Sequence, residues 1–210
     1  ATGGTITTCG NDKIHTFTGP GTFAVSQAAS SATNNKVSYL VLAGGGGAGH
    51  SFPTSNAGGG GGAGGYREVK NPVNPFTASP LDGFCTPANV ITLTATSFPI
   101  TVGGGGPGAP SSGPSATSGS PSVFSTITAA GGGRGAANGP AATGGSGGGG
   151  AGGTSCASIG TGAAGNTPPV TPPQGNSGGT NFKVATGNPP DNPGAGGGGA
   201  SAAAPTAPTG

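Results

Sequence analysis

Six uninterrupted runs of glycine constrain this chain more than any other feature. The runs, each of three to five glycines, occupy residues 44–47, 58–62, 103–106, 131–133, 147–150 and 196–199. Segments rich in Pro, Ser, Asn and Thr separate them. An α-helix is excluded over such tracts because glycine is among the poorest helix formers. The tracts must either be flexible linkers or adopt an order that does not depend on side chains.

The ordered alternative is an array of polyglycine-II helices. Collagen is excluded because glycine does not recur at every third position. An extended helix with three residues per turn forms no internal hydrogen bonds, so its amides need partners on neighbouring segments. Neighbours approach closely enough only where no Cβ lies between them, and interior positions must therefore be glycine. The candidate scaffold glycines are Gly44, Gly45, Gly46, Gly60, Gly61, Gly104, Gly105, Gly148 and Gly149.

Large apolar residues are concentrated in the first part of the chain. Of the 28 Val, Ile, Leu and Phe residues, 24 precede residue 131. Runs of β-branched and aromatic residues bounded by turn formers predict strands. These strands are expected over residues 13–18, 22–26, 36–42, 66–70, 90–96, 98–102 and 123–128. Gly19-Pro20-Gly21 predicts a hairpin turn between the first two.

The sequence therefore predicts two regions. Residues 1–130 form a β-strand-containing module with the first glycine tracts, and residues 131–210 form a glycine- and proline-rich region that continues the array. The fold class is mainly β plus irregular structure, with a small β module templating packed glycine-rich helices with surface loops. Essentially no α-helix is expected.

Composition excludes several classes of function. With ten charged residues and a net charge of +2 in 210 residues, the chain lacks the Lys and Arg clusters that nucleic acids and anionic membranes require. The longest apolar stretch, 37–43, is far shorter than the roughly 20 residues of a membrane span. Scarcity of large apolar residues also argues against a compact enzyme core of ordinary size.

No catalytic, cofactor or metal site stands out. Gly60, Gly62 and Gly65 satisfy a dinucleotide fingerprint without its strand–helix context. Ser177 lies in a G-x-S-x-G pattern, but residues 144–148 match the same pattern, so any glycine-rich chain produces it. Cys9, Cys85 and His15 have no spacing typical of a closed metal site. We expect no enzyme activity, no cofactor and no metal.

The non-glycine residues at the strand–glycine junctions resemble a known family. Residues 14–25 (IHTFTGPGTFAV) and 39–47 (YLVLAGGGG) are similar to the opening blocks of the glycine-rich domain of bacteriophage tail fibre proteins. Residues 58–67, 99–103 and 122–129 resemble its later blocks. After residue 133 the similarity is one of composition, and the closing strand usual in the family does not precede Gly210.

The resemblance implies a structural virion component at the outer end of a tail fibre. Its expected partners are other fibre subunits or copies of itself, as a homo-oligomer, and a host surface glycan or outer-membrane protein. Receptor contact is expected from loops on a rigid scaffold. The candidate contact residues are His50, Phe52, Tyr66, Phe182 and Asn181. For Tyr66, which lies beside a tract end, a packing role is the stronger interpretation.

Two alternatives stay open at this point. A secreted glycine-rich protein that assembles into an extracellular filament through exposed strand edges fits the same composition. An ice-binding protein is a weaker alternative, because flat polyglycine-II faces bearing Ala and Thr could order water.

Overall fold

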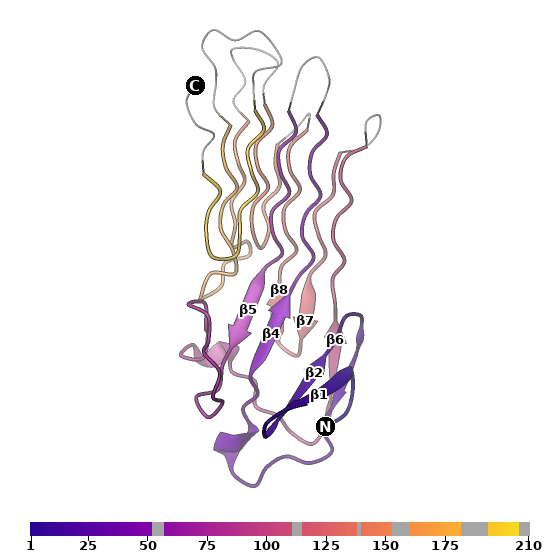
Figure 1. Ribbon diagram of the computed structural model, residues 1–210, viewed down its shortest axis with the longest axis vertical. Coiled ribbons are helices and arrows are strands. Elements are labelled where there is room, and N and C mark those ends of the chain that lie inside the picture. The colour runs from indigo at the N-terminus through magenta and orange to yellow at the C-terminus, as the bar shows by residue number, and fades with distance from the viewer. Residues whose placement is uncertain (52–56, 111–114, 138–139, 153–159, 182–192, 206–210) are drawn as a thin grey trace.

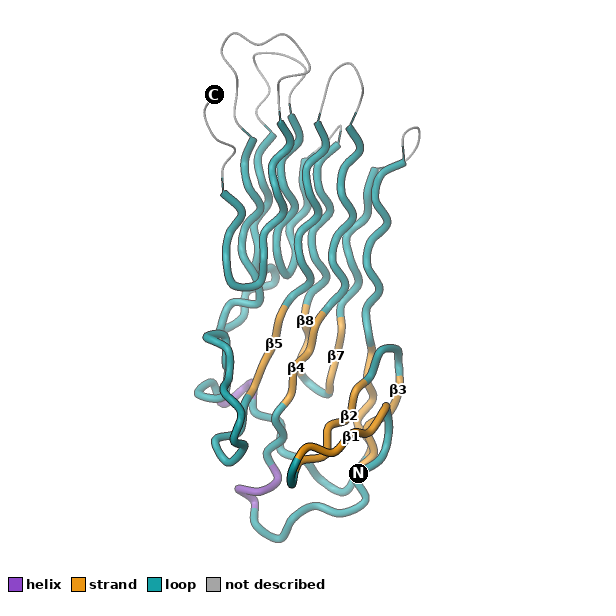
Figure 2. Tube along the Cα trace, viewed as in Figure 1, coloured by secondary structure: helices purple, strands orange, loops and turns teal. Residues whose placement is uncertain are grey.

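The chain forms two regions stacked along one long axis, with β-sheets at one end and parallel extended segments at the other (Figure 1). This computed structural model describes residues 1–210 except 52–56, 111–114, 138–139, 153–159, 182–192 and 206–210. The sheets form the β module, and the extended segments beyond them form the glycine array (Figure 2). We refer to the end of the array farther from the sheets as the distal end.

Short strands build the β module. In the described residues they are β1 (Thr5–Cys9), β2 (Asp12–Thr16), β3 (Gly21–Ala24), β4 (Tyr39–Leu42), β5 (Tyr66–Val69), β6 (Ser97–Thr101), β7 (Ser122–Phe124) and β8 (Ile127–Ala129). All pairing between them is antiparallel, in sheets β1-β2, β3-β6-β7-β8 and β4-β5. Two 3-10 turns, η1 (Ala32–Asn35) and η2 (Pro87–Asn89), are the helical elements of the described chain.

A small aromatic core lies between the four-stranded sheet and β4–β5. Phe23, Val41, Phe124 and Ile127 are buried together. The Phe124 ring lies 6.0 Å from Phe23 and 5.9 Å from Tyr39, both in edge-on contacts. The alternation of β4 directs Tyr39 and Val41 towards this core, whereas Leu40 and Leu42 are exposed. Hydrophobic burial therefore stabilises this end of the molecule.

Backbone hydrogen bonds with a period of three hold the glycine array. The amides of Gly44 and Gly47 donate to the carbonyls of Ser120 and Thr117, so a step of three residues on one segment matches three on its antiparallel neighbour. Parallel neighbours follow the same rule, as where Gly132 and Gly135 donate to residues 44 and 47. A period of three is that of the polyglycine-II helix. The predicted fold class is confirmed: a small β module carries a packed array of glycine-rich extended helices.

The hydrogen bonds cross from one sequence region to the other. Gly59 and Gly62 donate to the carbonyls of Ala136 and Gly133, while Gly60 and Ala63 donate to those of Ala195 and Gly198. Amides of segment 57–65 thus donate to two different neighbouring segments, and both of those segments lie beyond residue 130 in the sequence. Tracts from both predicted regions therefore interleave in one array.

Several local predictions were wrong. Residues 90–96 form no strand. The chain that lies opposite them turns into η1, so their pairing is limited to the isolated bridge Lys36↔Thr92. Residues 123–128 are two strands, because the chain reverses at Ser125, whose φ is 54°. Gly19-Pro20-Gly21 does not close a hairpin, since β2 pairs with β1 and β3 pairs with β6. β1 itself was not predicted.

Candidate interaction surface

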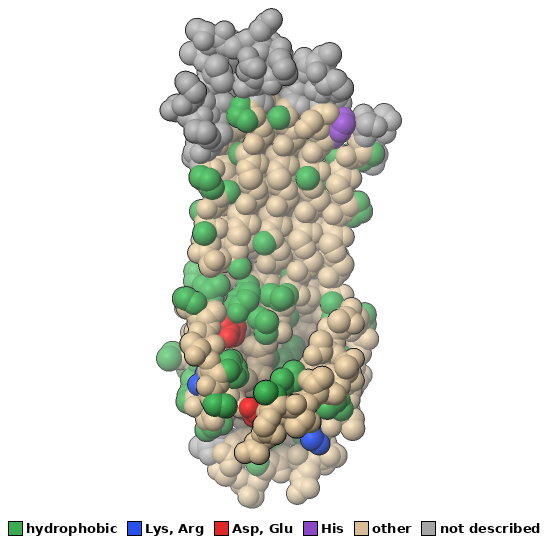
Figure 3. All heavy atoms as spheres, in the orientation of Figure 1, with side chains coloured by type: hydrophobic (Ala, Val, Ile, Leu, Met, Phe, Trp, Pro, Cys, Tyr) green, Lys and Arg blue, Asp and Glu red, His purple; other side chains and the backbone are tan. Residues whose placement is uncertain are grey.

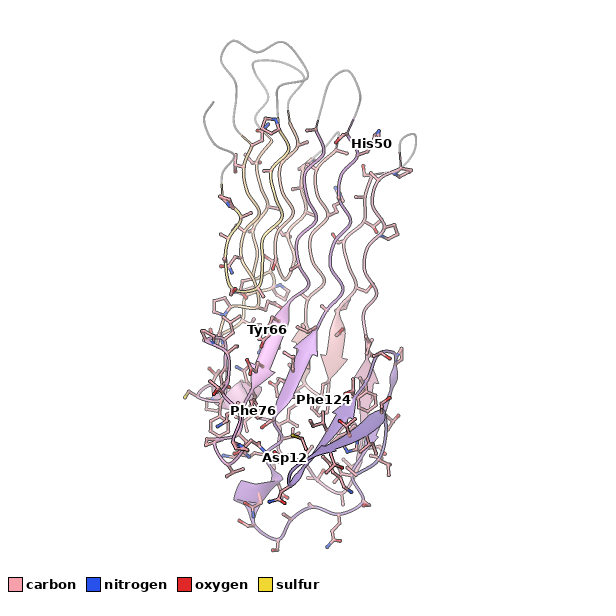
Figure 4. The ribbon with its side chains drawn as sticks, viewed as in Figure 1. Asp12, His50, Tyr66, Phe76 and Phe124 are labelled. Carbon is pink, nitrogen blue, oxygen red and sulfur yellow. The ribbon has the colours of Figure 1, made fainter. Side chains whose placement is uncertain are left out.

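The distal end of the array gathers segment ends from distant parts of the sequence. His50 lies there (Figure 4), and Ser51, the next residue, contacts Gly58 on a neighbouring segment. The amide of Gly58 donates to Ser51 Oγ at 3.0 Å, and that of Gly49 donates to the Gly59 carbonyl at 2.8 Å. These bonds fix the spacing of two neighbouring segment ends. The array is therefore a scaffold that holds its end positions at set distances.

Of the predicted contact residues, His50 lies at the distal end (Figure 4). Its side chain is half-buried, at the point where the segment beginning at Ala43 ends. Phe52 and Phe182 fall outside the described residues, so their predicted role stays a prediction. His50 therefore stays a candidate for contact at the distal end.

Tyr66 lies at the opposite end of the array, where β5 begins (Figure 4). Its amide donates to the Gln174 carbonyl at 2.8 Å, and its hydroxyl donates to Glu68 Oε2 at 2.9 Å. Burial, with the nearby Glu68 carboxylate, raises its pKa, and the hydrogen bond with Ser79 opposes that shift. Tyr66 thus packs at the junction between β module and array, far from His50.

Asn181 is inside the array. It is 3% exposed. Its Oδ1 accepts from the Gly160 amide at 2.7 Å, and its own amide donates to the Gly160 carbonyl at 2.9 Å. The Asn181 side-chain oxygen thus accepts a hydrogen bond that a backbone carbonyl of a neighbouring segment would otherwise accept. A contact role needs an exposed side chain, so this placement makes Asn181 a scaffold residue instead.

The scaffold glycines fall into two groups by the room around them. A Cβ on Gly44, Gly46, Gly61, Gly148 or Gly149 would lie 2.0–2.2 Å from a neighbouring carbonyl oxygen, and one on Gly60 would lie 3.0 Å from the Gly197 nitrogen. Real Cβ atoms essentially never approach within 3.0 Å, so the first five glycines are required for packing, whereas at Gly60 the contact would be tight. Among the described residues, positive φ occurs only at Gly3, Gly4 and Gly10 for glycine. The array therefore needs glycine for its missing side chain, not for its backbone freedom.

Three predicted scaffold glycines lie where a side chain fits. A Cβ on Gly104 would have nothing within 4 Å, and one on Gly45 or Gly105 would lie 3.6 Å from a carbonyl oxygen, an ordinary contact. Gly104 and Gly105 are exposed because the segment that contains them borders solvent. Sequence alone does not distinguish these border glycines from interior ones within the same run.

The side faces of the array are polar but nearly uncharged. Arg134 is the one charged side chain among the described array residues. In the face seen in Figure 3, the charged groups lie over the β module, while backbone and uncharged side chains with scattered hydrophobic ones cover the array. Long-range electrostatic attraction therefore contributes little to binding at these faces.

Sequence reasoning missed the polar side chains that join the array to the β module. Gln174 is fully buried; its Oε1 accepts from the Ala130 amide and its Nε2 donates to the Pro168 carbonyl, both at 2.8 Å. Asn166 Oδ1 accepts from the amides of Val170 and Gln174 and shapes this loop. A lone amide in a proline-rich segment gives no sequence signal for such a role.

Asn89 makes a second connection at this junction. Its Oδ1 accepts from Arg67 Nη2, and its Nδ2 donates to the Thr171 carbonyl at 2.7 Å. The Tyr39 hydroxyl donates to the Asn89 carbonyl at 2.7 Å. Burial lowers the pKa of Arg67 and raises that of Tyr39 to about 12. These contacts tie β4 and β5 to the loop around Thr171, more than 80 residues away in sequence.

Neither serine motif forms a catalytic arrangement in the described chain. Ser146 has no exposed surface, and its Oγ has no hydrogen-bond partner among the described residues. Ser177 is exposed, on the segment that packs against residues 163 and 204. Cys9 and Cys85 are exposed free thiols. No group of three or more His, Cys, Asp or Glu residues is placed to hold a metal ion in the part of the chain that the structure describes.

Comparison with known proteins identifies the family. A family model described as "Glycine-rich domain" matches residues 17–210. The chain belongs to this family. The matched residues include the strands from β3 onwards and the array. No curated protein and no solved structure matches the chain. Within the described ranges, no helix has the length and apolar character needed to cross a membrane.

Proposed function

We propose that this glycine-rich domain protein is a non-enzymatic structural component of a phage tail fibre, at its distal end, where it attaches to a host receptor. The observation that carries the proposal is the single distal end at which the array gathers its segment ends. The resemblance of residues 14–133 to the corresponding tail fibre domain supplies the virion context. Host surface glycan or outer-membrane protein is the proposed receptor, and the virion is the proposed location.

The construction of the array supports an attachment role. Its hydrogen bonds with a period of three fix each segment against several neighbours. A loop whose two ends are held at a fixed separation loses less conformational entropy on binding than a free chain does, which strengthens binding. Recognition residues in many proteins lie on loops that a rigid scaffold positions. A nearly uncharged array also allows the loops, rather than a general electrostatic attraction, to determine specificity.

Binding of labelled protein to bacterial cells tests the role. We expect the double variant Phe52→Ala/Phe182→Ala to bind host cells at least about tenfold more weakly, as loss of an aromatic contact typically causes. Phe76→Ala is the matched control, because Phe76 is a 46% exposed phenylalanine of the β module. Equal binding by the two variants, each with unchanged melting, would contradict the proposed distal contact.

Immunogold electron microscopy of the source particle tests the location. Label at the tips of tail fibres is the expected result. Label confined to free repeating fibrils, with none on virions, would overturn the virion proposal and favour the extracellular filament.

A further inference from the structure

The strand β1 presents an uncovered edge and two exposed faces. All five of its residues are exposed, and no backbone hydrogen bond joins it to any strand but β2 in the described chain. Two large apolar side chains of this hairpin are also exposed, Ile6 at 45% and Ile14 at 48%. Figure 1 shows the β1–β2 hairpin in front of the β module, with β1 outermost.

Contacts from β2 and from Thr2, which precedes β1, fix the hairpin to the rest of the module. Thr2 and Ala24 exchange two backbone hydrogen bonds, of 2.8 and 3.0 Å. The His15 ring packs edge-on against Phe23 at 4.9 Å, and Asn74 Nδ2 donates to Asp12 Oδ1 at 3.0 Å. The edge of β1 is therefore held in place before any partner arrives.

Two other sheet edges in this module carry further backbone pairing. The Thr2↔Ala24 bridge covers the edge of β3, and the Glu68↔Asp82 bridge brings residues 79–83 along β5. Proteins that leave an edge open usually protect it with a charge, a proline or a bulge. The β1 sequence, Thr-Ile-Thr-Thr-Cys, contains neither a charge nor a proline, and its register with β2 runs without a bulge. An unprotected edge of this kind is a template for strand addition.

We propose that β1 pairs antiparallel with β1 of a second copy of this chain, about a two-fold axis at Thr7. Two copies of this five-residue strand overlap along their full length only when the middle residue, Thr7, lies on the axis. A strand without charge brings no like charges together when it pairs with itself. A foreign strand gains its specificity from side-chain pockets beside the edge, whereas all five residues of β1 are exposed. This inference is independent of the attachment role.

The pairing extends the rows of side chains on both faces of the hairpin. Because Thr7 is opposite Ile14 in the hairpin, the dimer forms a row Ile14–Thr7–Thr7–Ile14 across four strands on one face. On the other face, Ile6 of one copy lies opposite Thr8 of the second. Cys9 lies opposite Thr5 of the second copy. Such an interface is small, so association is weak in dilute solution and strengthens where other contacts hold the copies together.

Disulfide trapping tests the register. In a background with Cys9, Cys85 and Cys156 changed to Ser, Thr7→Cys places two thiols across the axis, within the separation that a disulfide spans. We expect Thr7→Cys to form a covalent dimer under mild oxidation at least ten times faster than Thr128→Cys. Thr128 is the matched control, an exposed threonine at the middle of β8. Equal rates for the two variants would overturn the proposed interface.

Sedimentation of the untrapped protein supplies an independent measurement. The unaltered chain should show a concentration-dependent increase in mass that Thr7→Lys abolishes, because two ammonium groups would face each other across the axis. Thr128→Lys should retain it. A chain that stays monomeric at every concentration and is not trapped by Thr7→Cys, or a dimer unaffected by Thr7→Lys in folded protein, would refute the proposal.

Discussion

The β module and the glycine array are stabilised by different interactions within one chain. The module buries Phe23, Phe124 and Ile127 in a side-chain core, and its strands pair in the ordinary way. In the array, backbone amides and carbonyls of neighbouring segments take the place of that core. Side-chain volume stabilises the first region and would disrupt the second. The comparison shows that close packing can be achieved either by filling space or by leaving no side chain in it.

The largest expected effect comes from adding a side chain inside the array. Gly148→Val should prevent folding, because its Cβ alone would lie 2.0 Å from the Arg134 carbonyl oxygen. Overpacking of a dense interior typically costs about 1–3 kcal/mol, and a clash with rigid backbone exceeds that. Soluble yield and thermal unfolding measure the effect.

Gly104→Val is the matched control for that change. It adds the same side chain to another glycine run, where nothing lies within 4 Å of the Cβ position. Its melting temperature should stay close to that of the unaltered protein. If both variants melt normally, close backbone packing is not what holds the array.

Removing a side chain from the β module is the converse experiment. Phe124→Ala should lower the free energy of unfolding by about 3–5 kcal/mol, as is usual for a buried phenylalanine. The ring contacts Phe23, Tyr39 and Phe98. Denaturant titration measures the loss, with Phe76→Ala as a 46% exposed control. Phe124→Ala unfolding like that control would mean that the aromatic core contributes little.

Disrupting the junction between the regions should have an intermediate effect. Gln174→Ala removes the acceptor of the half-buried Ala130 amide and should cost about 1–3 kcal/mol. Ser177→Ala, an exposed change in the next segment, serves as the control. Amide hydrogen exchange would locate the weakening, which we expect at residue 130 first. A uniform loss across the β module would instead indicate that the two regions unfold as one unit.

A small effect of opposite sign is expected inside the array. Ser146 Oγ is buried without a hydrogen-bond partner in the described chain, so Ser146→Ala removes an unsatisfied group. The free energy of unfolding should stay constant or rise by about 1 kcal/mol. Ser120→Ala, at an exposed serine of the array, controls for the change in composition. Clear destabilisation by Ser146→Ala alone would show that the hydroxyl has a stabilising contact.

The smallest effect concerns the protonation of the module interior. Burial raises the pKa of Tyr39 from 10.0 to about 12. Between these values the unfolded chain loses a proton that the folded chain keeps, so this contribution to stability is complete below pH 10 and falls as the pH rises towards 12. Ultraviolet absorbance of tyrosinate follows it directly. Tyr39→Phe should abolish the tyrosine transition near pH 12; a Tyr39 that titrates at pH 10 would contradict its burial.

Local sequence patterns predicted much of the fold but little of the junction. Runs such as 39–42 and 66–69 are recognisable strands because β-branched and aromatic residues alternate or cluster there. Residues 90–96 have the same composition but lack a partner strand of matching length, which no local pattern reveals. Gln174 and Asn89 were missed because their partners, Ala130 and Thr171, lie 44 and 82 residues away.

The sequence by itself determined that the tracts can pack backbone against backbone, because only glycine lacks the atom that would keep neighbours apart. It also determined where the apolar core lies, since large apolar residues are concentrated before residue 131. The tertiary structure decided which glycines are interior, because Gly148 and Gly104 differ only in the segments beside them. It likewise decided which end of the array each segment end reaches. Hydrogen-bond partners such as Gly60 and Ala195 are chosen by three-dimensional packing, and a sequence composed of identical glycines carries no signal for that choice.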